Sequence, residues 1–546
     1  MVMDMPVNGL QMCFVKCNKT KGGDYSMLAK LRLYANTVKL MKPSQIYYRV
    51  RKTLKLDCSI GCKVTGNVSK TNSIATVREL DFDSVFLERF PADEFFYDKV
   101  TFLHSSKIFH WNEKWHFDDK SALWNFNLHY FEFLFSLVNA YRNTGEKKYL
   151  DKSAETIRWW IVQNPKSSGG EGWSPYTIDL RLTNWLSYYT AVKDELDDDF
   201  QRLFIKSIHE QYEFLSRHLE KDILGNHYFE DLKTLVLCAL FFKDEKILKV
   251  ALKAFKQECR EEILPDGMHF ELSPMYHKLI FEGVIRVAVA LKDAGMEDCN
   301  INGYLQPMLD AAWSMEEGLE RIPLFNDSGN NVAKSLQALV FACKNHFGIT
   351  PKYRTRFENS GFYIFKKDDW KLIVDAGQPG PAYIPGHAHC DAMSFELFKA
   401  GKPVIVNCGT YAYQCKERNF FRGTAAHNTV MLNNTEQSQC WGAFRMAKRS
   451  RVKVVSVSEK SIVMELVDQK GQVVRRTIQI GDNLSVTDES NGKITGYLHI
   501  VSDILVHIEG NQKIVKQQYA CKYGAKIPID ALEYEGVERV SVQIDL

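Results

Sequence analysis

Long apolar runs are missing from this chain. No uninterrupted apolar stretch in its 546 residues reaches about eighteen, the length that indicates a membrane-spanning helix. The start, MVMDMPVNGLQMCFVKC, also lacks the basic region, long apolar core and small-residue cleavage site of a secretory signal. These two absences favour a cytoplasmic protein, with the periplasm as the alternative.

A large net charge and a dense cysteine pattern are missing too. The formal net charge of +3 gives no reason to expect a nucleic-acid partner, and none is predicted. The thirteen cysteines are odd in number and scattered, unlike those of a disulfide scaffold, so we expect mostly free thiols. With 45% hydrophobic and 25% charged residues the composition is that of a globular protein, and the length favours two or three domains.

Positive charge is concentrated at the N-terminus. The first sixty residues carry three acidic side chains against eleven basic ones: Lys16, Lys19, Lys21, Lys30, Arg32, Lys39, Lys42, Arg49, Arg51, Lys52 and Lys55. A basic amphipathic leader of this kind can lie on an anionic membrane surface or contact a partner. A solvated helical face is the alternative, and the sequence leaves both open.

Residues 121–346 have apolar side chains at helical spacing. In LWNFNLHYFEFLFSLVNAYRNTG, for example, Phe126, Tyr130 and Phe133 share one face. Further helices are expected over 148–161, 179–192, 199–219, 232–242, 245–263, 274–294, 304–318 and 330–345. Because the connections are short and rich in turn formers, consecutive helices should pack as antiparallel hairpins.

After residue 354 the pattern changes to alternation typical of strands. In GFYIFKKDDWKLIVDAG two such runs are joined by a turn at 367–369, which predicts a hairpin. Further strands are expected over 402–407, 428–433, 451–457, 461–466, 473–480, 483–489 and 497–508, at the spacing of a sandwich. We therefore predict a basic N-terminal leader with a helical or irregular region over 1–100, a helical domain over 101–350 and an antiparallel β domain over 351–546.

Two polar clusters fall in the helical part. In GNHYFED, Asn226 and His227 stand at the start of an expected helix, where an amide, an imidazole and free backbone N–H groups can bind a carboxylate. In ELSPMYH, Tyr276 carries a phenol whose pKa near 10 must be lowered by its neighbours before it can act as a base. A simple helix cap and a packed core tyrosine are the alternatives.

A third, richer cluster falls on expected loops and strand ends of the β domain. It spans PGHAHCDAMSFELFKAGKPVIVNCGTYAY and FFRGTAAHNTV and contains His387, His389, Asp391, Asn407, Tyr411, Tyr413, Arg422 and His427. Two imidazoles and an oxygen ligand can bind zinc, so His389 and His427 are candidate metal ligands. A hydrogen-bonded histidine pair in a strand is the alternative.

Taken together and in order, these tracts resemble the heparinase II/III family of polysaccharide lyases. GHAHCDAMSFEL, VNCGTYAY and AAHNTV are similar to its β domain, and WNFNLHYF, NPKSSGGEGWSPYTIDLRLTNW, GNH and ELSPMYH to its helical domain. The resemblance covers the chain from about residue 121 onward. It implies a multidomain α+β fold in which an incomplete (α/α) toroid is followed by an antiparallel β-sandwich domain.

The resemblance also implies roles for individual residues. Asn226 would neutralise a uronate carboxylate with His227 beside it, Tyr276 would remove the C5 proton, and His387 would donate or share a proton. Binding of the anionic substrate would fall to His227, Arg181, Tyr411 and Arg422.

A metal in this family's β domain is held by two histidines and an aspartate, which correspond here to His389, His427 and Asn407. Because an amide brings no charge, Asn407 should weaken a zinc site, and no cofactor is expected to be required.

The expected function is cleavage of a uronic-acid-containing acidic polysaccharide by β-elimination, the work of a carbon–oxygen lyase. The tract LRLYANTVKLMKPSQIYYRVRKTLK resembles the leader of family members associated with bacterial surface-polysaccharide production, which suggests metabolism of such a glycan. Two alternatives remain. A uronyl C5-epimerase would use the same proton abstraction without chain cleavage, and a glycan-binding or biosynthesis protein would lack catalysis.

Overall fold

The structure, a computed structural model, describes residues 27–65, 76–80 and 83–546. The first part of the basic leader, with Lys16, Lys19 and Lys21, lies outside the described residues. Within the described ranges, no helix combines the length and the hydropathy that crossing a bilayer would require. The eleven cysteines in those ranges are free thiols.

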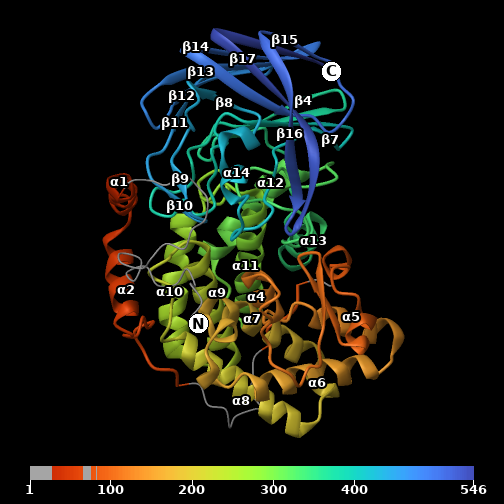
Figure 1. Cartoon of the computed structure of the whole chain (residues 1–546). Helices are drawn as coiled ribbons and strands as arrows, with labels where there is room; N and C mark the ends of the chain where they lie inside the picture. The colour runs from red at the N-terminus through yellow and green to blue at the C-terminus, as the bar shows by residue number, and fades with distance from the viewer. Residues whose placement is uncertain (1–26, 66–75, 81–82) are drawn as a thin grey trace.

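Ten helices build the larger domain (Figure 1): α4 (Ala122–Leu128), α5 (Leu134–Thr144), α6 (Lys148–Gln163), α7 (Pro175–Val192), α8 (Asp198–Leu215), α9 (Asn226–Phe241), α10 (Glu245–Glu262), α11 (Pro274–Asp293), α12 (Cys299–Glu316) and α13 (Leu336–Phe347). Helix α9 packs against both α7 and α11, and all three helices are buried on nearly every side. Their partners α8, α10 and α12 bury a single face. This inner and outer layering confirms the predicted incomplete (α/α) toroid.

The N-terminal elements lie against the outside of the toroid. They are α1 (Met27–Val38), α2 (Pro43–Thr53), the short α3 (Ser84–Leu87) and the hairpin of β1 (Lys99–Phe102) and β2 (Ser105–Ile108). Figure 1 shows α1 and α2, in red, along one edge of the molecule, with α10 next to α2.

The second domain consists of two antiparallel sheets. The first has the order β3–β4–β5–β6–β7, with β3 (Arg356–Phe357), β4 (Phe362–Lys367), β5 (Trp370–Asp375), β6 (Phe395–Lys399) and β7 (Lys402–Ile405). The second contains β8 (Val430–Leu432), β11 (Arg451–Val457), β12 (Ser461–Val467), β13 (Val473–Ile480), β14 (Asn483–His499), β15 (Val506–Glu509), β16 (Asn511–Lys522) and β17 (Ala525–Asp545). Side chains of both sheets share one apolar core, so the predicted β-sandwich is confirmed.

The predicted elements differ from the structure in several places. The first helical run is divided into α4 and α5, with Phe131 between them at φ of 62°, and α9 begins at Asn226 instead of 232. The runs over 483–489 and 497–508 were expected as separate strands. Instead, β14 is continuous from Asn483 to His499, and the end of the second run falls in β15. Strands β16 and β17 were not expected at all. The last helix begins at Leu336 instead of 330, because Ser335 caps it by accepting a hydrogen bond from the N–H of Ala338.

The two domains meet through the loop between α12 and α13. Arg321 of this loop forms a buried ion pair with Glu396 of β6, 3.0 Å between Nη1 and Oε2. Asp266, ahead of α11, accepts hydrogen bonds from the backbone N–H and hydroxyl of Ser360. The predicted limits at 100 and 350 stay predictions, and the structure has α13 end at Phe347 and β3 begin at Arg356.

Candidate active site

Tyr276 lies in the first turn of α11, where the toroid faces the β domain. Ser273 caps this helix and accepts a hydrogen bond from the N–H of Tyr276 at 3.2 Å, and Pro274 occupies the first helical position. The Ser273 hydroxyl in turn donates to the carbonyl of Asp327 at 2.7 Å. The start of α11 is therefore fixed to the loop that crosses to the β domain.

The phenol of Tyr276 begins a chain of three tyrosine hydroxyls. Its oxygen lies 2.8 Å from that of Tyr413, which lies 2.8 Å from that of Tyr523. The Tyr276 ring also packs on the imidazole of His387, with 4.0 Å between ring centroids. Burial raises the pKa of Tyr276 well above its ordinary value, so the phenol is neutral near pH 7.

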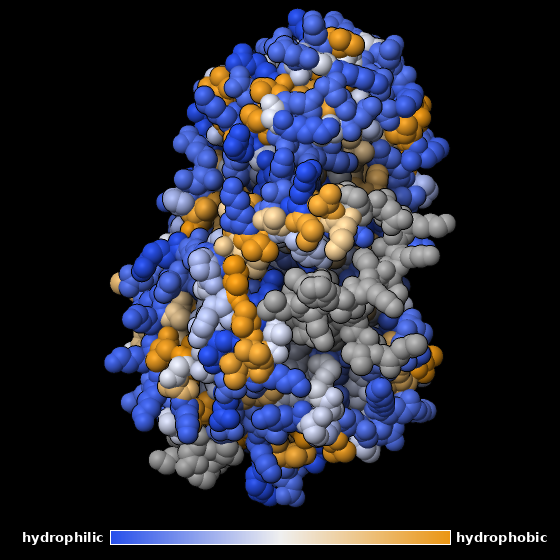
Figure 2. All heavy atoms as spheres, turned by 60° about the vertical axis from the view of Figure 1, so that its left-hand side comes forward, coloured by the Kyte–Doolittle hydropathy of each residue, from blue (hydrophilic) through white to orange (hydrophobic). Residues whose placement is uncertain are grey.

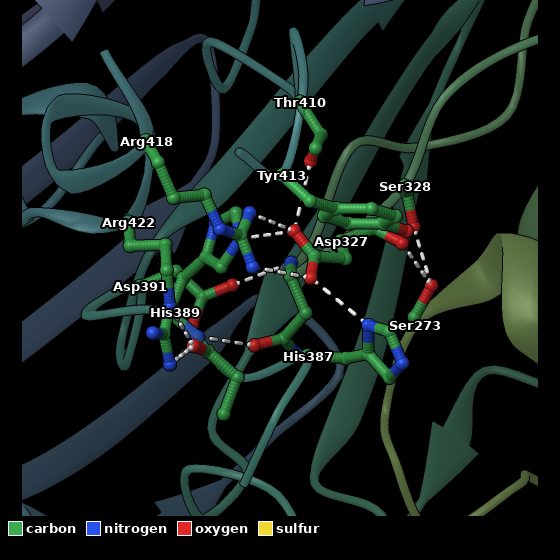
Figure 3. Close-up of polar contacts among 12 residues, drawn as sticks. Ser273, Asp327, Ser328, His387, His389, Asp391, Thr410, Tyr413, Arg418 and Arg422 are labelled. Atoms are coloured by element: carbon green, nitrogen blue, oxygen red, sulfur yellow. Dashed lines mark hydrogen bonds and ion pairs between the residues drawn. The ribbon is translucent and has the colours of Figure 1, made fainter. Parts of the chain in front are cut away.

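Asp327 is the anionic centre of the site (Figure 3). Its carboxylate accepts from Nδ1 of His387 at 2.9 Å and from Nε2 of His389 at 2.8 Å. Arg418 binds both carboxylate oxygens, and Thr410 donates to Oδ1 at 3.2 Å. Four side chains of the β domain thus converge on one residue of the loop that follows the toroid helix α12.

The protonation of this centre follows from its partners. Burial alone would raise the pKa of Asp327, but Arg418, His389 and His387 hold that pKa well below its ordinary value. Burial lowers the pKa of His389 to about 4, so its ring is neutral. Nδ1 of His387 faces Asp327, which leaves Nε2 on the side away from the carboxylate.

Asn226 and His227 form the start of α9, after Gly225 with φ of 59°. Asn226 is 4% exposed, and its Oδ1 has no hydrogen-bond partner among the described residues. Nδ1 of His227 lies 2.7 Å from Oε2 of Glu220. Burial lowers the pKa of His227 but the Glu220 carboxylate outweighs it, so that this pKa lies above its ordinary value.

Contacts through side chains connect the two clusters. The His227 ring packs on Tyr176 with 4.6 Å between centroids, and Tyr176 is close enough to contribute to the raised pKa of Tyr276. A Cβ built on Gly225 would lie 2.9 Å from Oε1 of Glu271 and 3.0 Å from Ile384. Glu271 belongs to the segment of Tyr276 and Ile384 to that of His387, so the three predicted catalytic segments meet at one place.

A small hairpin closes one side of the site. It comprises β9 (Cys440–Trp441) and β10 (Arg445–Met446), with Phe444 between them. The Phe444 ring lies 5.1 Å from that of Tyr413 and 6.1 Å from that of His387. At the other end of the hairpin, Trp441 contacts helix α1. Its ring meets that of Tyr34 edge to face, with 4.8 Å between centroids, and its Nε1 donates to the Thr37 hydroxyl.

Two of the predicted substrate-binding residues lie in the interior, which corrects that expectation. Arg181 is 0% exposed and donates to Gln211 and to two backbone carbonyls within the toroid. Arg422 is 0% exposed and donates to backbone carbonyls, among them that of Ala388 at 2.9 Å. Both guanidiniums have their hydrogen bonds satisfied away from solvent and hold loops in place, so a polysaccharide cannot contact them here.

The other two residues predicted to bind substrate, His227 and Tyr411, are not enclosed in the same way. His227 keeps a third of its side chain exposed beside Asn226. Tyr411 lies under the Lys526 ammonium, 4.5 Å from the ring centroid, and no contact connects it to Tyr276 among the described residues. Its role stays a prediction.

The candidate metal ligands do not form a convincing zinc site. His389 Nδ1 and His427 Nε2 lie 3.3 Å apart, but that distance also suits a direct hydrogen bond between two neutral rings. The amide oxygen of Asn407 accepts from the N–H of Asn428, and the nearby Asp327 carboxylate is already neutralised by Arg418. In the described ranges no group of three acidic, histidine or cysteine side chains has an arrangement that could hold a metal ion. The set lacks an anionic ligand for a divalent cation.

Sequence reasoning missed Asp327, Arg418 and Tyr523 and gave Tyr413 no role. Asp327 stands in FNDSGNN, a polar run after a helix that looks like an ordinary loop. Arg418 and Tyr523 lie 91 and 110 residues from their partners Asp327 and Tyr413. Only the TYAY motif, with Tyr413, offered a signal.

Two family models match the chain. Heparinase II/III N-terminus matches residues 25–352 and alone spans more than half of it, and Heparinase II/III-like, C-terminal matches residues 349–532.

Curated relatives are similar at a lower level of coverage. The heparin-sulfate lyase of Pedobacter heparinus is 25% identical over 360 residues, which cover 59% of this chain and 53% of that protein. The heparin-sulfate lyase of Bacteroides thetaiotaomicron is 22% identical over 470 residues, 75% of this chain and 65% of that protein. The chain thus spans between half and two thirds of these relatives.

Solved structures share the fold. Heparinase III superposes with a TM-score of 0.66 at 16% identity, covering 95% of this chain and 90% of that one. Heparan sulfate lyase HepC from Pedobacter heparinus gives 0.53 at 18% identity, with 92% and 87% covered. With family models matched to both of its domains and this two-domain fold in common, the chain belongs to the heparinase II/III family.

Proposed function

We propose that this chain cleaves a uronic-acid-containing acidic polysaccharide by β-elimination, as a carbon–oxygen lyase. The observation that carries the proposal is the contact of Tyr276 with His387, whose ring is oriented by the Asp327 carboxylate. A phenol and an oriented imidazole within one contact supply the two proton transfers that elimination needs.

Asn226 and His227 are assigned to the uronate carboxylate. They lie at the N-terminus of α9, where unpaired backbone N–H groups and the helix dipole favour an anion. The Asn226 amide is a neutral hydrogen-bond donor that can bind a carboxylate oxygen through its NH2 group. Neutralising the carboxylate acidifies the C5 proton and stabilises the enolate-like charge that develops as it leaves.

Tyr276 and His387 then carry out the proton transfers. Because the buried phenol is neutral, it must transfer its proton before it can accept the one from C5. We assign that proton to the imidazole of His387, which packs on the Tyr276 ring, and the Tyr413 hydroxyl, 2.8 Å away, then donates a hydrogen bond to the phenolate. The C5–H pair of electrons forms the C4–C5 double bond, the C4–O bond breaks, and the leaving oxygen receives a proton from Tyr276 or His387.

The side-by-side rings favour elimination over epimerisation. A C5-epimerase removes the proton from one face of the sugar and returns one to the other face, which calls for groups on opposite sides. Tyr276 and His387 pack ring on ring and so approach a bound sugar from the same side.

The relatives support a choice of substrates for the test. Those relatives are heparin-sulfate lyases, so a sulfated glucosaminoglycan is the first candidate polymer. The resemblance of the leader to proteins of surface-polysaccharide production adds bacterial capsular uronates and alginate to the panel. Metabolism of a surface polysaccharide stays part of this proposal.

The test is to incubate the protein with that panel and follow the ultraviolet absorbance of the unsaturated uronate. On a responsive polymer, Tyr276→Phe should lower kcat by roughly 10²- to 10⁴-fold, the usual contribution of a positioned acid–base group. Tyr188→Phe is the matched control, because it removes an equally buried hydroxyl that lies 2.7 Å from Ser153 in the toroid core.

Three outcomes contradict the proposal. Full activity of Tyr276→Phe would remove that residue from the reaction. Deuterium incorporation at C5 without chain cleavage would identify an epimerase. If no uronate polymer were cleaved but one were still bound, a glycan-binding protein would be favoured.

A further inference from the structure

Helix α2 lies on the toroid with its polar face inward. Gln45 is buried and donates from Nε2 to the carbonyl of Ile223 at 3.0 Å. Arg49 donates to the carbonyl of Asp222, and Nζ of Lys52 lies 3.2 Å from the Asp222 carboxylate. The contacts that hold this helix are therefore hydrogen bonds and ion pairs, the reverse of an ordinary surface helix.

The apolar face of α2 points to solvent instead. Ile46, Tyr47, Val50 and Leu54 are 42, 55, 41 and 63% exposed. Their spacing places them within an arc of about 100° on the helix, so they form one continuous stripe. An exposed contiguous apolar stripe of this kind marks an interaction surface.

The stripe continues beyond α2. Met27, Leu28 and Leu31 of α1 are 80, 70 and 55% exposed, and Leu56 after α2 is 48% exposed. Residues 27–56 contribute ten of the 25 large hydrophobic side chains that are exposed in the described part of the chain. Figure 2 shows a band of hydrophobic side chains along the side of the molecule that carries these helices.

Positive charge surrounds the stripe. The described residues from Met27 to Asp57 contain one acidic side chain, Asp57, against eight basic ones: Lys30, Arg32, Lys39, Lys42, Arg49, Arg51, Lys52 and Lys55. Lys30, Arg32, Lys39 and Lys55 are exposed. The neighbouring helix α10 adds exposed Lys249, Lys253 and Arg260. The whole chain carries only +3, so the charge is local to this side.

We propose that α1 and α2 form a docking surface for an anionic lipid membrane. Apolar side chains flanked by lysine and arginine match the headgroup boundary, where the stripe enters the acyl region and the cations meet lipid phosphates. A second copy of the chain fits less well, because two such faces would oppose the four exposed basic residues of one helix pair with four more. The proposal does not depend on the lyase reaction.

Vesicle binding by the full-length chain tests the proposal. The protein should float with phosphatidylcholine vesicles that contain phosphatidylglycerol, much less with phosphatidylcholine alone, and less as salt is raised. Lys30→Gln and Lys39→Gln should each weaken binding to the anionic vesicles about fivefold, the effect of one basic residue near such a surface.

The apolar stripe is tested by Ile46→Glu/Leu54→Glu, which should abolish vesicle binding while the far-ultraviolet circular dichroism stays unchanged. Ile514→Glu/Val537→Glu is the matched control, because these β-domain side chains are 71 and 74% exposed and the lysines beside Ile514, Lys513 and Lys516, pair with Glu533 and Asp530. The control should bind vesicles like the wild type.

Several results would overturn the proposal. They are equal binding to neutral and anionic vesicles, undiminished binding by Ile46→Glu/Leu54→Glu, and lipid-free self-association that this variant abolishes. A lower melting temperature of the same variant without lipid would also do so, because it would mean that another part of the chain covers the stripe.

Discussion

The histidines of the site differ in charge because their surroundings differ. His227 stands beside the Glu220 carboxylate, which raises its pKa, whereas burial lowers the pKa of His389 to about 4. His227, at the proposed carboxylate position, therefore holds its positive charge to a higher pH than an ordinary imidazole, whereas the ring at the hydrogen-bonded centre is neutral. Two residues of one type serve opposite electrostatic purposes.

This difference predicts a pH dependence of substrate binding. Because the pKa of His227 is raised, its positive charge persists above pH 6.5 and is lost only as pH rises through that higher value. The KM for a responsive uronate polymer should therefore rise between about pH 6 and pH 9. His227→Gln should show a higher KM that no longer changes with pH over this interval.

Steady-state kinetics across that interval provide the measurement. His507→Gln is the control, since that imidazole is 65% exposed in β15 and should leave the wild-type profile unchanged. An unaltered profile in His227→Gln would show that another group titrates.

Single residues of the site were predictable only where a motif marked them. Asn226, Tyr276 and His387 stand in GNH, ELSPMYH and GHAHCD, and the structure brings their segments together. Arg181 and Arg422 stand in equally distinctive tracts, yet they are buried. Whether an arginine faces substrate or backbone carbonyls depends on packing between distant segments, which local sequence does not reveal.

At the scale of elements, the start of α11 decides where Tyr276 points. One hydroxyl, that of Ser273, caps the helix, meets the Asp327 carbonyl and lies 2.8 Å from the Ser328 hydroxyl. The cap thus joins the orientation of the helix to the loop that carries the anionic centre.

Ser273→Ala should lower the free energy of unfolding by about 1–2 kcal/mol, because the cap is lost and buried polar groups lose a partner. It should also lower kcat more than it changes KM, since Tyr276 is positioned through this cap. Ser273→Thr, which keeps the hydroxyl, should recover most of kcat. Denaturant titration and kinetics on a responsive polymer measure both effects.

Ser335→Ala is the matched control. Ser335 caps α13 with the same 3.2 Å hydrogen bond, but it lies outside the candidate site. It should lose stability without losing kcat, and an equal loss of kcat in both variants would refute a positioning role for Ser273.

Regular elements were predictable from periodicity, and irregular ones were not. The amphipathic helices and the β4–β5 hairpin follow spacing rules that act within a few residues. Strand β17 runs from Ala525 to Asp545 with irregular burial and pairs with three strands, so its pattern follows no single alternation. Strand β14 passes through an irregularity after Glu489, which hid its continuity.

At the scale of the whole molecule, Asp327 joins the two domains. Its loop follows the toroid helix α12, while His387, His389 and Arg418 belong to the β domain. All four side chains are nearly inaccessible to solvent. An ion that is buried in this way is costly to leave without its partner.

Asp327→Asn should lower the free energy of unfolding by about 3–5 kcal/mol at neutral pH, because Arg418 loses its counter-ion in the interior. The pKa of Asp327 is lowered in the folded protein, so its contribution is present above the unfolded value near 3.9 and is lost as pH falls through the folded value. The difference from wild type should stay constant between about pH 5 and pH 8 and shrink below about pH 4.

Denaturant unfolding at a series of pH values measures this difference. Asp482→Asn is the control, since that carboxylate is fully exposed in the turn before β14 and should change stability by about 0.5 kcal/mol or less. A difference that grew on acidification would contradict the assigned charge state.

The β9–β10 hairpin connects helix α1, at the edge of the molecule, with the candidate active site. Phe444, just before β10, packs against Tyr413 and His387, while Trp441 of β9 contacts Tyr34 and Thr37 of α1. A hairpin of only seven residues joins the contact on α1 to Phe444. A polymer that displaces Phe444 would therefore also strain the contact of Trp441 with α1. Because thermodynamic coupling is reciprocal, a ligand on α1 that changes the affinity of the site has its own affinity changed by the site's ligand by the same factor.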